Sequence, residues 1–430
     1  MKVWRVLLVV ILLMSLVLTM SSSLLAEQIT LTVTDWSATR EKYFKDLIPK
    51  FEALNPDIKI NYIRKPGGQY HDELQTAFVA GVGIPDLPMV EISSMGKFMK
   101  GKETPFLDLT DWIKTYRPKL IESRLNHWSY FGKVWAVPQD IHPSVLIYRR
   151  DFFAEAGFSS DPSQVEKLLE TWEKFVIVGQ KLTKDINGDG KIDRYMIFLE
   201  PWMQYWLMIL QQRSGMFDRA GKVILDDRVN IDTLRFVVDL LNKYKIAALY
   251  PSGAAFYSAV DDGNVVTVMG AEWHIGYVKQ YTPKTAGKWG AIPLPAWPTT
   301  KIRTGTQGGS AMTITKACKH PEAAKRFIEF VFLSKDNIKT RWSSTYQLPP
   351  LRDALTLPDI VNVPDPYFGG QKFGALIAKL ARQIPTYYMS PYWPEALDAA
   401  QNEIRLAIEG QKTPEQALKD AANKVRGVIK

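Results

Sequence analysis

The 430-residue chain has a single cysteine, Cys318, so it cannot form an internal disulfide bond. It has five histidines, and no two of them lie three or four residues apart, which excludes a local zinc-binding pair. The sequence also lacks a G-x-x-x-x-G-K phosphate loop, a G-x-S-x-G nucleophile elbow and a G-x-G-x-x-G fingerprint after a strand. These absences exclude the usual signatures of nucleotide-binding proteins and serine hydrolases.

The one long apolar run stands at the N-terminus, where "VLLVVILLMSLVLTM" follows Lys2 and Arg5. Its length of about 15 residues is typical of a signal peptide rather than a membrane-spanning helix, although an uncleaved anchor is the alternative. We interpret residues 1–26 as an export signal that is cleaved after about Ala26. No cysteine stands at that point to carry a lipid, and an exported chain without disulfides suggests a bacterial periplasm.

Neither the charge nor the composition is extreme. The net charge of +9 falls to +7 once Lys2 and Arg5 leave with the signal, and acidic and basic residues alternate throughout. A mixed surface with a small excess of basic residues is compatible with an anionic ligand, but it does not indicate binding to nucleic acid. With 46% hydrophobic and 23% charged residues, the chain is neither disordered nor a multi-span membrane protein. We expect a monomer.

Hydrophobic periodicity predicts two α/β units, as the length also suggests, since single cores stop growing at roughly 250–300 residues. The first unit has the order β-α-β-α-β, which indicates a parallel sheet with helices on both faces. Its expected elements are a strand from Ile29, a helix at 41–56, a strand at 58–64, a helix at 70–82 and a strand at 85–92. The second has strands at 144–153, 195–200 and 265–270, with helices at 170–184 and 234–245. Later elements are a strand at 308–317 and helices at 320–332, 393–411 and 413–425.

Three short proline-containing stretches are candidate crossings between the two units, near residues 137–142, 291–297 and 348–351. Several crossings make a hinge rather than a loose tether. We therefore expect an N-terminal lobe of residues 27–139 plus 293–345, and a C-terminal lobe of residues 140–292 plus 346–430.

Aromatic residues gather after predicted strands and beside the proline breaks. An indole or phenol offers a flat face to the C–H groups of a sugar ring, while neighbouring acids accept bonds from its hydroxyls. A single tryptophan more often belongs to a hydrophobic core, but the grouping of these rings favours a binding surface. The candidates that follow strands are Trp36, Glu200, Trp202, Tyr205 and Trp273; Trp342 precedes the third proline break, and Trp393 stands where the last long helix begins.

Two loops carry weaker signals. In "DINGDGKID", the residues Asp185, Asn187, Asp189, Lys191 (through its carbonyl) and Asp193 have calcium-loop spacing, but Met196 replaces the usual glutamate at position 12. A weak structural Ca²⁺ site and a simple Asn-Gly/Asp-Gly turn are both compatible with this pattern. The second loop is "GTQGGS", where Gly308 would allow the backbone to approach a ligand closely or simply form a tight turn.

Taken in order, these motifs resemble the extracellular solute-binding proteins of bacterial ABC importers, specifically their maltose-binding-like carbohydrate group. The likeness spans nearly all of the mature chain. It rests on the segments "AGVGIPDL", "YFGKVWAVPQDIHPSVLIYRRDFFAEAGF", "LTKDINGDGKIDRY", "GGSAMTITKACKHPEAAKRFIEFV" and "YWPEALDAAQNEIRLAIEGQKTPEQALKDA". The resemblance implies a two-lobed type II periplasmic binding protein fold with a ligand cleft between the lobes, and an ABC permease in the inner membrane as partner.

The resemblance also implies site residues. Glu200 and Trp202 fall on a sugar-contacting acid and aromatic of the family, and Trp273 and Trp393 fall on its two stacking tryptophans. After "PD" the chain departs from the pattern and offers only Glu91 and Ser93. His142 replaces the family's acid after the first crossing, with Asp140 two residues earlier.

The resemblance implies a carbohydrate-binding protein that is not an enzyme and requires no cofactor. The departures from the family's pattern indicate a different sugar or a different pose. Two alternatives stay open: a secreted glycoside hydrolase that uses two acids of the cleft, and the same fold with an anionic solute such as glycerol phosphate.

Overall fold

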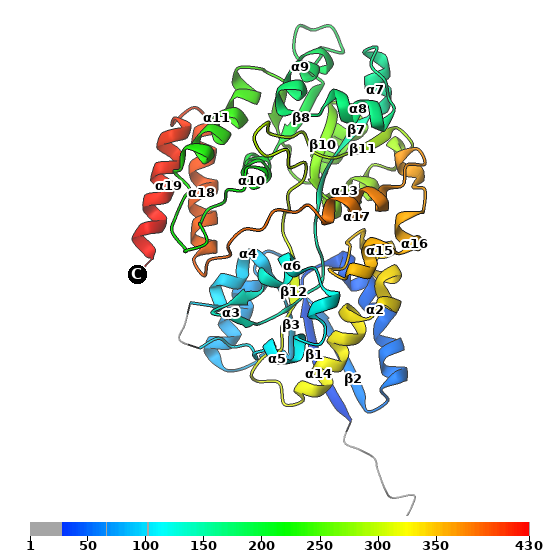
Figure 1. Cartoon of the computed structure of the whole chain (residues 1–430), viewed down its shortest axis with the longest axis vertical. Coiled ribbons are helices and arrows are strands. Elements are labelled where there is room, and N and C mark those ends of the chain that lie inside the picture. Colours follow the sequence, from blue (N-terminus) through cyan, green and yellow to red (C-terminus); the bar gives the residue numbers. More distant parts are fainter. Residues whose placement is uncertain (1–27, 66, 101–102, 430) are drawn as a thin grey trace, which may run out of the picture.

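A computed structural model describes residues 28–65, 67–100 and 103–429. The expected export signal lies outside these residues. The chain forms two lobes, each built around a five-stranded sheet, with the N-terminal lobe below and the C-terminal lobe above in Figure 1. The predicted two-lobed α/β fold is confirmed.

The sheet of the N-terminal lobe has the strand order β2-β1-β3-β12-β6. Its first three strands are parallel, as the alternation of strands and helices predicts. β12 returns from much later in the chain and pairs antiparallel with β3 and β6. The strands are β1 (Ile29–Asp35), β2 (Ile58–Arg64), β3 (Leu87–Glu91), β6 (Val137–Pro138) and β12 (Ser310–Met312). A small hairpin pairs β4 (Ser129–Tyr130) with β5 (Lys133–Val134).

Helices cover this sheet. The longest, α2, begins where the Ser37 side chain accepts a hydrogen bond from the Arg40 amide, and it ends at Asn55, before Pro56. Its apolar stripe packs on the sheet through Tyr43, Phe44 and Leu47. The helices of this lobe are α2 (Ala38–Leu54), α3 (Tyr70–Ala80), α4 (Ile92–Met95), α5 (Thr110–Ile113), α6 (Glu122–Asn126), α14 (Pro321–Ile328) and α15 (Ile338–Thr345).

The sheet of the C-terminal lobe has the order β11-β7-β10-β8-β9. β10 runs parallel to β8 and antiparallel to β7, so this sheet is mixed. Its strands are buried along most of their length, which explains their continuous apolar runs. They are β7 (Ser144–Arg149), β8 (Tyr195–Leu199), β9 (Ala247–Leu249), β10 (Val265–Ala271) and β11 (Trp289–Ile292).

The helices of the C-terminal lobe end with a long antiparallel pair, α18 and α19 (Figure 1). Thr413 caps α19 by accepting from the Gln416 amide, with Pro414 at the first helical position, as the sequence predicts. Gly410 ends α18 in the left-handed conformation at φ 73°. The helices are α7 (Arg150–Glu155), α8 (Pro162–Leu168), α9 (Trp172–Leu182), α10 (Pro201–Gln211), α11 (Arg228–Asn242), α12 (Ala254–Asp261), α13 (Glu272–Tyr281), α16 (Pro358–Val361), α17 (Phe373–Ala381), α18 (Trp393–Ile408) and α19 (Pro414–Val428).

Two crossings lie later in the chain than the sequence suggests. Residues 293–304 pack in the C-terminal lobe, where the Trp297 indole donates to the Met208 carbonyl and the Ala296 amide donates to the Glu170 carbonyl. We therefore place the second crossing at 305–310 rather than 291–297. Pro350 still accepts a hydrogen bond from the amide of Ile121, so the chain leaves the N-terminal lobe after residue 351.

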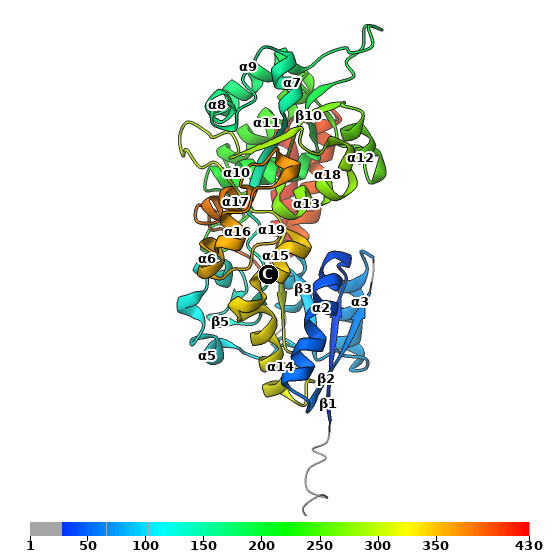
Figure 2. The ribbon, with the colours of Figure 1, turned by 90° about the vertical axis from the view of Figure 1, so that its right-hand side faces the viewer.

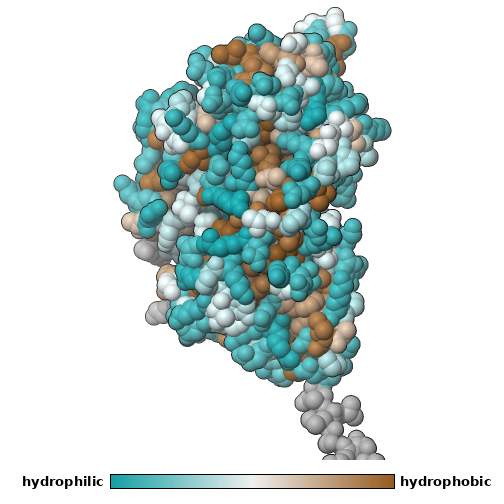
Figure 3. All heavy atoms as spheres, turned by 45° about the vertical axis from the view of Figure 1, so that its right-hand side comes forward, coloured by the Kyte–Doolittle hydropathy of each residue, from teal (hydrophilic) through white to brown (hydrophobic). Residues whose placement is uncertain are grey.

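The molecular surface is mainly polar. On the face in Figure 3, hydrophilic residues dominate and apolar residues show only in small separate patches. Over the described ranges, no helix combines the length and apolarity that crossing a bilayer requires. Cys318 is buried, and burial raises the pKa of its thiol to about 11, which makes it unreactive at neutral pH.

Candidate functional site between the lobes

The crossing at 305–310, "GTQGGS", holds the elements of the candidate site together. Gly308 and Gly309 both have positive φ, at 73° and 144°, where a side chain would be strained. A Cβ atom on Gly309 would also lie 2.4 Å from the Arg124 side chain. The glycines therefore let this segment pass closely between side chains of both lobes. The close neighbours of these glycines are protein side chains, and an approach of the Gly308 backbone to a ligand stays a prediction.

Trp36 contacts this crossing indirectly, because it packs against Arg40, which bonds to Ser310. The Arg40 guanidinium lies 4.3 Å from the Trp36 ring centroid, donates to both carboxylate oxygens of Asp35, and donates to the Ser310 hydroxyl at 3.0 Å. Asp35 and Arg40 are buried, whereas Trp36 is half-buried. The ion pair therefore fixes the indole at the end of β1 and leaves part of its surface accessible.

Trp273 approaches the crossing from the C-terminal lobe. It is the second residue of α13, directly after β10, and its indole donates to the Gln307 carbonyl at 3.1 Å. The position of a Cβ on Gly308 lies 3.8 Å from the same indole nitrogen. The ring is half-buried, so it too keeps an accessible surface.

Trp202 contacts the crossing indirectly, because it stacks on Trp206, which bonds to Thr306. The two rings stack at 5.7 Å with planes 17° apart, and the Trp206 indole donates to the Thr306 carbonyl at 3.0 Å. Trp206 is buried and Trp202 is half-buried, so the inner indole supports the outer one. Three partly accessible indoles, two from one lobe and one from the other, are thus fixed to neighbouring residues of one crossing.

Most of "LEPWMQYW" is core. α10 begins at Pro201, and every residue from Met203 to Gln211 is buried. Only Glu200, Pro201 and Trp202 at its start are accessible. Desolvation raises the pKa of the Glu200 carboxyl, which stands at the N-cap position beside Trp202.

Five predicted ligand contacts are buried in this structure: Tyr205, Trp342 and Trp393, which pack against other side chains, and Asp140 and His142, which belong to a buried polar network. Tyr205 is 0% exposed inside the C-terminal lobe, because it points to the packed side of α10. Trp342 is buried against Tyr346 at 5.4 Å, because α15 lies on α2. Trp393 is also buried, but its edge meets Trp206 at 5.0 Å, so it supports the Trp202–Trp206 stack from behind.

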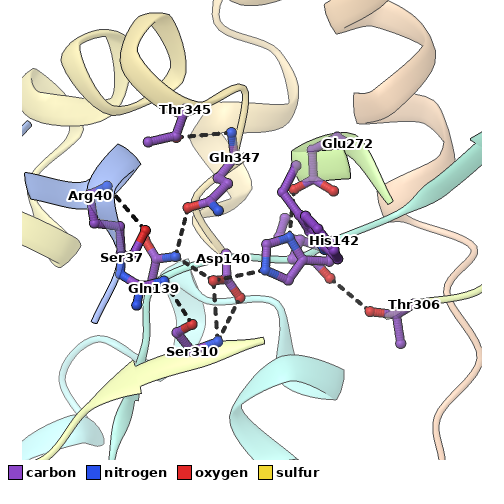
Figure 4. Close-up of polar contacts among 12 residues, drawn as sticks. Ser37, Arg40, Gln139, Asp140, His142, Glu272, Thr306, Ser310, Thr345 and Gln347 are labelled. Carbon is purple, nitrogen blue, oxygen red and sulfur yellow. Dashed lines mark hydrogen bonds and ion pairs between the residues drawn. The ribbon is translucent and has the colours of Figure 1, made fainter. Parts of the chain in front are cut away.

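A buried polar network joins the lobes at the first crossing (Figure 4). His142 donates from Nε2 to Asp140 and from Nδ1 to Glu272, both at 2.9 Å. Asp140 also accepts from the Ser310 amide at 3.2 Å and pairs with Arg124. Because Glu272 begins α13, His142 couples the first crossing directly to the helix that carries Trp273.

The network is charged. Burial alone would lower the pKa of His142, but the carboxylates of Asp140 and Glu272 outweigh it and raise the pKa to about 9. Burial would likewise raise the pKa of Asp140, but His142 and Arg124 lower it to about 2. The imidazolium of His142 and the carboxylate of Asp140 therefore hold one another in the ionised form at neutral pH.

Glu91 and Ser93 lie at the end of β3, next to Ser310 on β12. The Glu91 amide donates to Nε2 of His71, whose own pKa falls to about 3 because of burial and the nearby Lys97 and Arg40. His71 is therefore a neutral acceptor that orients this strand end. Burial raises the pKa of the Glu91 carboxyl, opposed by the Ser93 hydroxyl and Arg40.

The site contains residues that sequence reasoning did not select. Trp206 belongs to the same aromatic motif as Trp202, four residues later, but the sequence does not select it as a ligand contact. Tyr387 lies 4.2 Å from the His127 ring and 5.0 Å from Trp206. For Glu272, and for Arg40 with its Ser310 bond, the sequence carries no local signal, because their partners are 130 and 270 residues away.

The calcium-loop hypothesis stays a prediction. Asp185 accepts from the amides of Gly188 and Gly190 at 2.6 and 2.7 Å, and Asp189 accepts from the Lys191 amide at 2.8 Å. Asn187 contacts Asp193 at 3.2 Å. These are the bonds of the turn interpretation, and the described residues contain no group of three acidic, histidine or cysteine side chains placed to hold a metal ion.

Residues 35–338 match the sequence model of the bacterial extracellular solute-binding proteins, and the chain belongs to this family. An arabinooligosaccharide-binding protein of Bacillus subtilis (strain 168) is 30% identical over 412 residues, which cover 92% of each chain. A lactose-binding protein of Rhizobium radiobacter is 23% identical, with 88% of each chain covered.

Solved structures share the fold. Maltose-bound MalE3 of T. maritima superposes with a TM-score of 0.74 at 21% identity, over 93% of this chain and 100% of its own. A binding protein of B. animalis subsp. lactis Bl-04 in complex with beta-1,6-galactobiose gives a TM-score of 0.74 at 21% identity, over 93% of this chain and 96% of its own. The maltose-binding-like resemblance is therefore confirmed for the fold.

Proposed function

We propose that the protein is the periplasmic sugar-binding component of an ABC importer. It captures a mono- or oligosaccharide between its lobes and delivers it to a permease in the inner membrane. The delivery step follows from membership of the family and from no feature of the site itself.

One observation carries the proposal. Trp273 bonds to the crossing at 305–310 directly, Trp36 and Trp202 contact it through Arg40 and Trp206, and all three indoles keep an accessible surface. Glu91 and Glu200 stand beside them as hydroxyl acceptors. Flat apolar faces with a few polar groups at their rim match a sugar ring. A ligand that touches both lobes also binds their closed arrangement more tightly, which shifts the hinge toward it.

The relatives support a carbohydrate as the solute class. The printed names and titles give an arabinooligosaccharide, lactose, maltose and galactobiose as their ligands. All of these are uncharged. The nearby guanidinium groups agree, because Arg40 is engaged by Asp35 and Arg124 by Asp140, which leaves neither charge free for an anionic solute.

The same network argues against a hydrolase that uses Asp140 and Glu272. Glycoside hydrolysis needs one carboxylic acid that is free to donate a proton and a second carboxylate that is free to attack or activate water. Asp140 and Glu272 are instead held by His142. Prolonged incubation with a bound sugar, followed by chromatography, should return the sugar unchanged.

Tryptophan fluorescence during titration with a panel of mono- and oligosaccharides tests the proposal. We expect a saturable change with at least one sugar, and a loss of roughly tenfold or more in affinity in Trp202→Ala, since a stacked ring contributes on the order of 1.5 kcal/mol. Trp112→Ala removes a half-buried indole that packs on Tyr116 outside the site, and it should bind normally. Unchanged affinity in Trp202→Ala would contradict the assignment.

A further inference from the structure

A hollow opens between the lobes next to Tyr277, the neighbour of Trp273 on α13. It has a volume of about 440 Å³, which is within the usual range for small-molecule sites. The structure brings α12 and α13 together with α15 and the first turn of α2 around it (Figure 2). The residues that line it are Ala38, Thr39 and Lys42 of α2, Tyr257 of α12, Tyr277, Gln280 and Tyr281 of α13, and Ser344 of α15.

Aromatic rings form a continuous row from the candidate site into this hollow. Trp273, Tyr277 and Tyr281 are four residues apart on α13, so they share one face of the helix. Trp273 meets Tyr277 at 6.0 Å, Tyr277 stacks with Tyr281 at 6.1 Å and 22°, and Tyr281 meets Tyr257 at 4.8 Å. Burial, together with the nearby Tyr281 and Tyr277, raises the pKa of Tyr257 to about 12, so its hydroxyl stays protonated at neutral pH.

Tyr277 and Tyr281, at the outer end of this row, are not part of the hydrophobic core. Tyr281 is 51% exposed, and neither Tyr277 nor Tyr281 packs into the two hydrophobic clusters of the described residues. The opposite wall of the hollow carries the small residues Ala38 and Thr39. Aromatic faces that are exposed toward a hollow commonly mark a binding surface.

We infer that this hollow, which we call the tyrosine subsite, takes further sugar units of an oligosaccharide whose first units lie at Trp202 and Trp273. The inference rests on the proposed function and deepens it, because it makes the ligand an oligosaccharide. Tyrosine faces stack on the C–H faces of sugar rings, while Lys42, Gln280 and Ser344 offer polar groups to the hydroxyls. No carboxylate lines the hollow, and the Lys42 ammonium at its edge disfavours a cationic ligand.

Binding as a function of ligand length tests the inference. The probes are two ladders, arabinooligosaccharides and maltooligosaccharides from disaccharide to hexasaccharide, and their affinities are measured by calorimetry. For the ladder that binds, we expect wild-type affinity to rise with length. In Tyr281→Ala and Tyr277→Ala the disaccharide should bind as in the wild type, while the longest sugars lose roughly three- to tenfold. Tyr281→Phe keeps the stacking face and should retain most of the affinity.

Tyr244→Ala is the matched control, because it removes a half-buried tyrosine that packs on Phe236 in the same lobe. It should leave the whole ladder unchanged. Wild-type affinity that is independent of length, or a tyrosine variant that weakens every length equally, overturns the tyrosine subsite but not sugar binding. If the wild type binds neither ladder nor any sugar of the panel, the proposed function fails as well.

Discussion

At the scale of single residues, His142 is the most constrained side chain of the site. Its backbone has φ 60°, a conformation that costs about 1 kcal/mol or more outside glycine, so the surrounding structure must hold it there. The bonds from its ring to the carboxylates of Asp140 and Glu272 hold it in this conformation. The residue therefore joins a strained backbone to a buried ion network.

We expect His142→Gln to destabilise the protein by about 3 kcal/mol, because Asp140 and Glu272 then remain buried without a cation between them. Urea unfolding followed by circular dichroism measures the loss. Lys174→Ala, which breaks an exposed pair with Glu170, is the control and should cost less than about 1 kcal/mol. Equal losses in the two variants would show that the network is not held by charge.

The same residue predicts a pH dependence. The pKa of His142 in the folded protein is raised to about 9 from 6.5, so its stabilising contribution is complete below pH 6.5 and is lost as the pH rises through about 9. The difference in unfolding free energy between wild type and His142→Gln should therefore shrink over that window. A difference that stays constant from pH 6.5 to above 9 would mean that the imidazolium does not stabilise the fold.

The sequence predicts correctly where the accessible indoles lie, but it does not predict which of the neighbouring aromatic side chains are buried. Trp36, Trp202 and Trp273 could be selected because each follows a strand, where ligands approach an α/β sheet. Tyr205 stands within the same motif as Trp202, yet it is fully buried. The face of a helix that is covered depends on which neighbours pack there, and no local pattern contains that information.

At the scale of elements, strands and long amphipathic helices could be predicted because their periodicity is strong. α10 could not, since it is apolar on nearly every side, and a short apolar run does not distinguish a helix from a strand. The crossing at 305–310 was placed too early because prolines at 293–298 suggested a break. Those prolines instead lie in an extended segment that is packed on α9 and α10.

The end of α4, in the N-terminal lobe, packs against the start of α18, in the C-terminal lobe. Gly96 lies so close to it that a Cβ would be 2.5 Å from the Pro391 carbonyl and 2.9 Å from the Pro394 ring. Lys100 and Glu395 pair across the same contact. Because one partner belongs to each lobe, we expect this contact to limit how closely the lobes approach.

We expect Gly96→Ala to push α4 away from α18 and to weaken sugar binding by roughly tenfold, since a Cβ contact under 3 Å forces backbone movement. Calorimetry measures the affinity, and small-angle X-ray scattering measures the separation of the lobes. Gly427→Ala is the control, because no atom lies within 4 Å of a Cβ added there within α19. Unaltered affinity in Gly96→Ala would mean that this contact does not limit closure.

At the scale of the whole molecule, the lobes share hydrophobic packing. One buried cluster contains Val90 of the N-terminal lobe together with Leu207 of the C-terminal lobe, and the other joins Leu31 to Trp289. With the His142 network, this packing makes a stiff hinge rather than a flexible linker. Binding of a ligand then changes mainly the angle between the two lobes.

Ligand binding should therefore stabilise the protein and make it more compact at the same time. At a free sugar concentration a hundredfold above its Kd, the unfolding free energy should rise by about 2.7 kcal/mol. The radius of gyration from small-angle scattering should fall at the same sugar concentrations that raise the unfolding midpoint, because both report the sugar joining the lobes. Trp202→Ala should shift both curves to higher sugar by the same factor. Stabilisation without compaction would place the ligand on a single lobe, and the interlobe site would then be wrong.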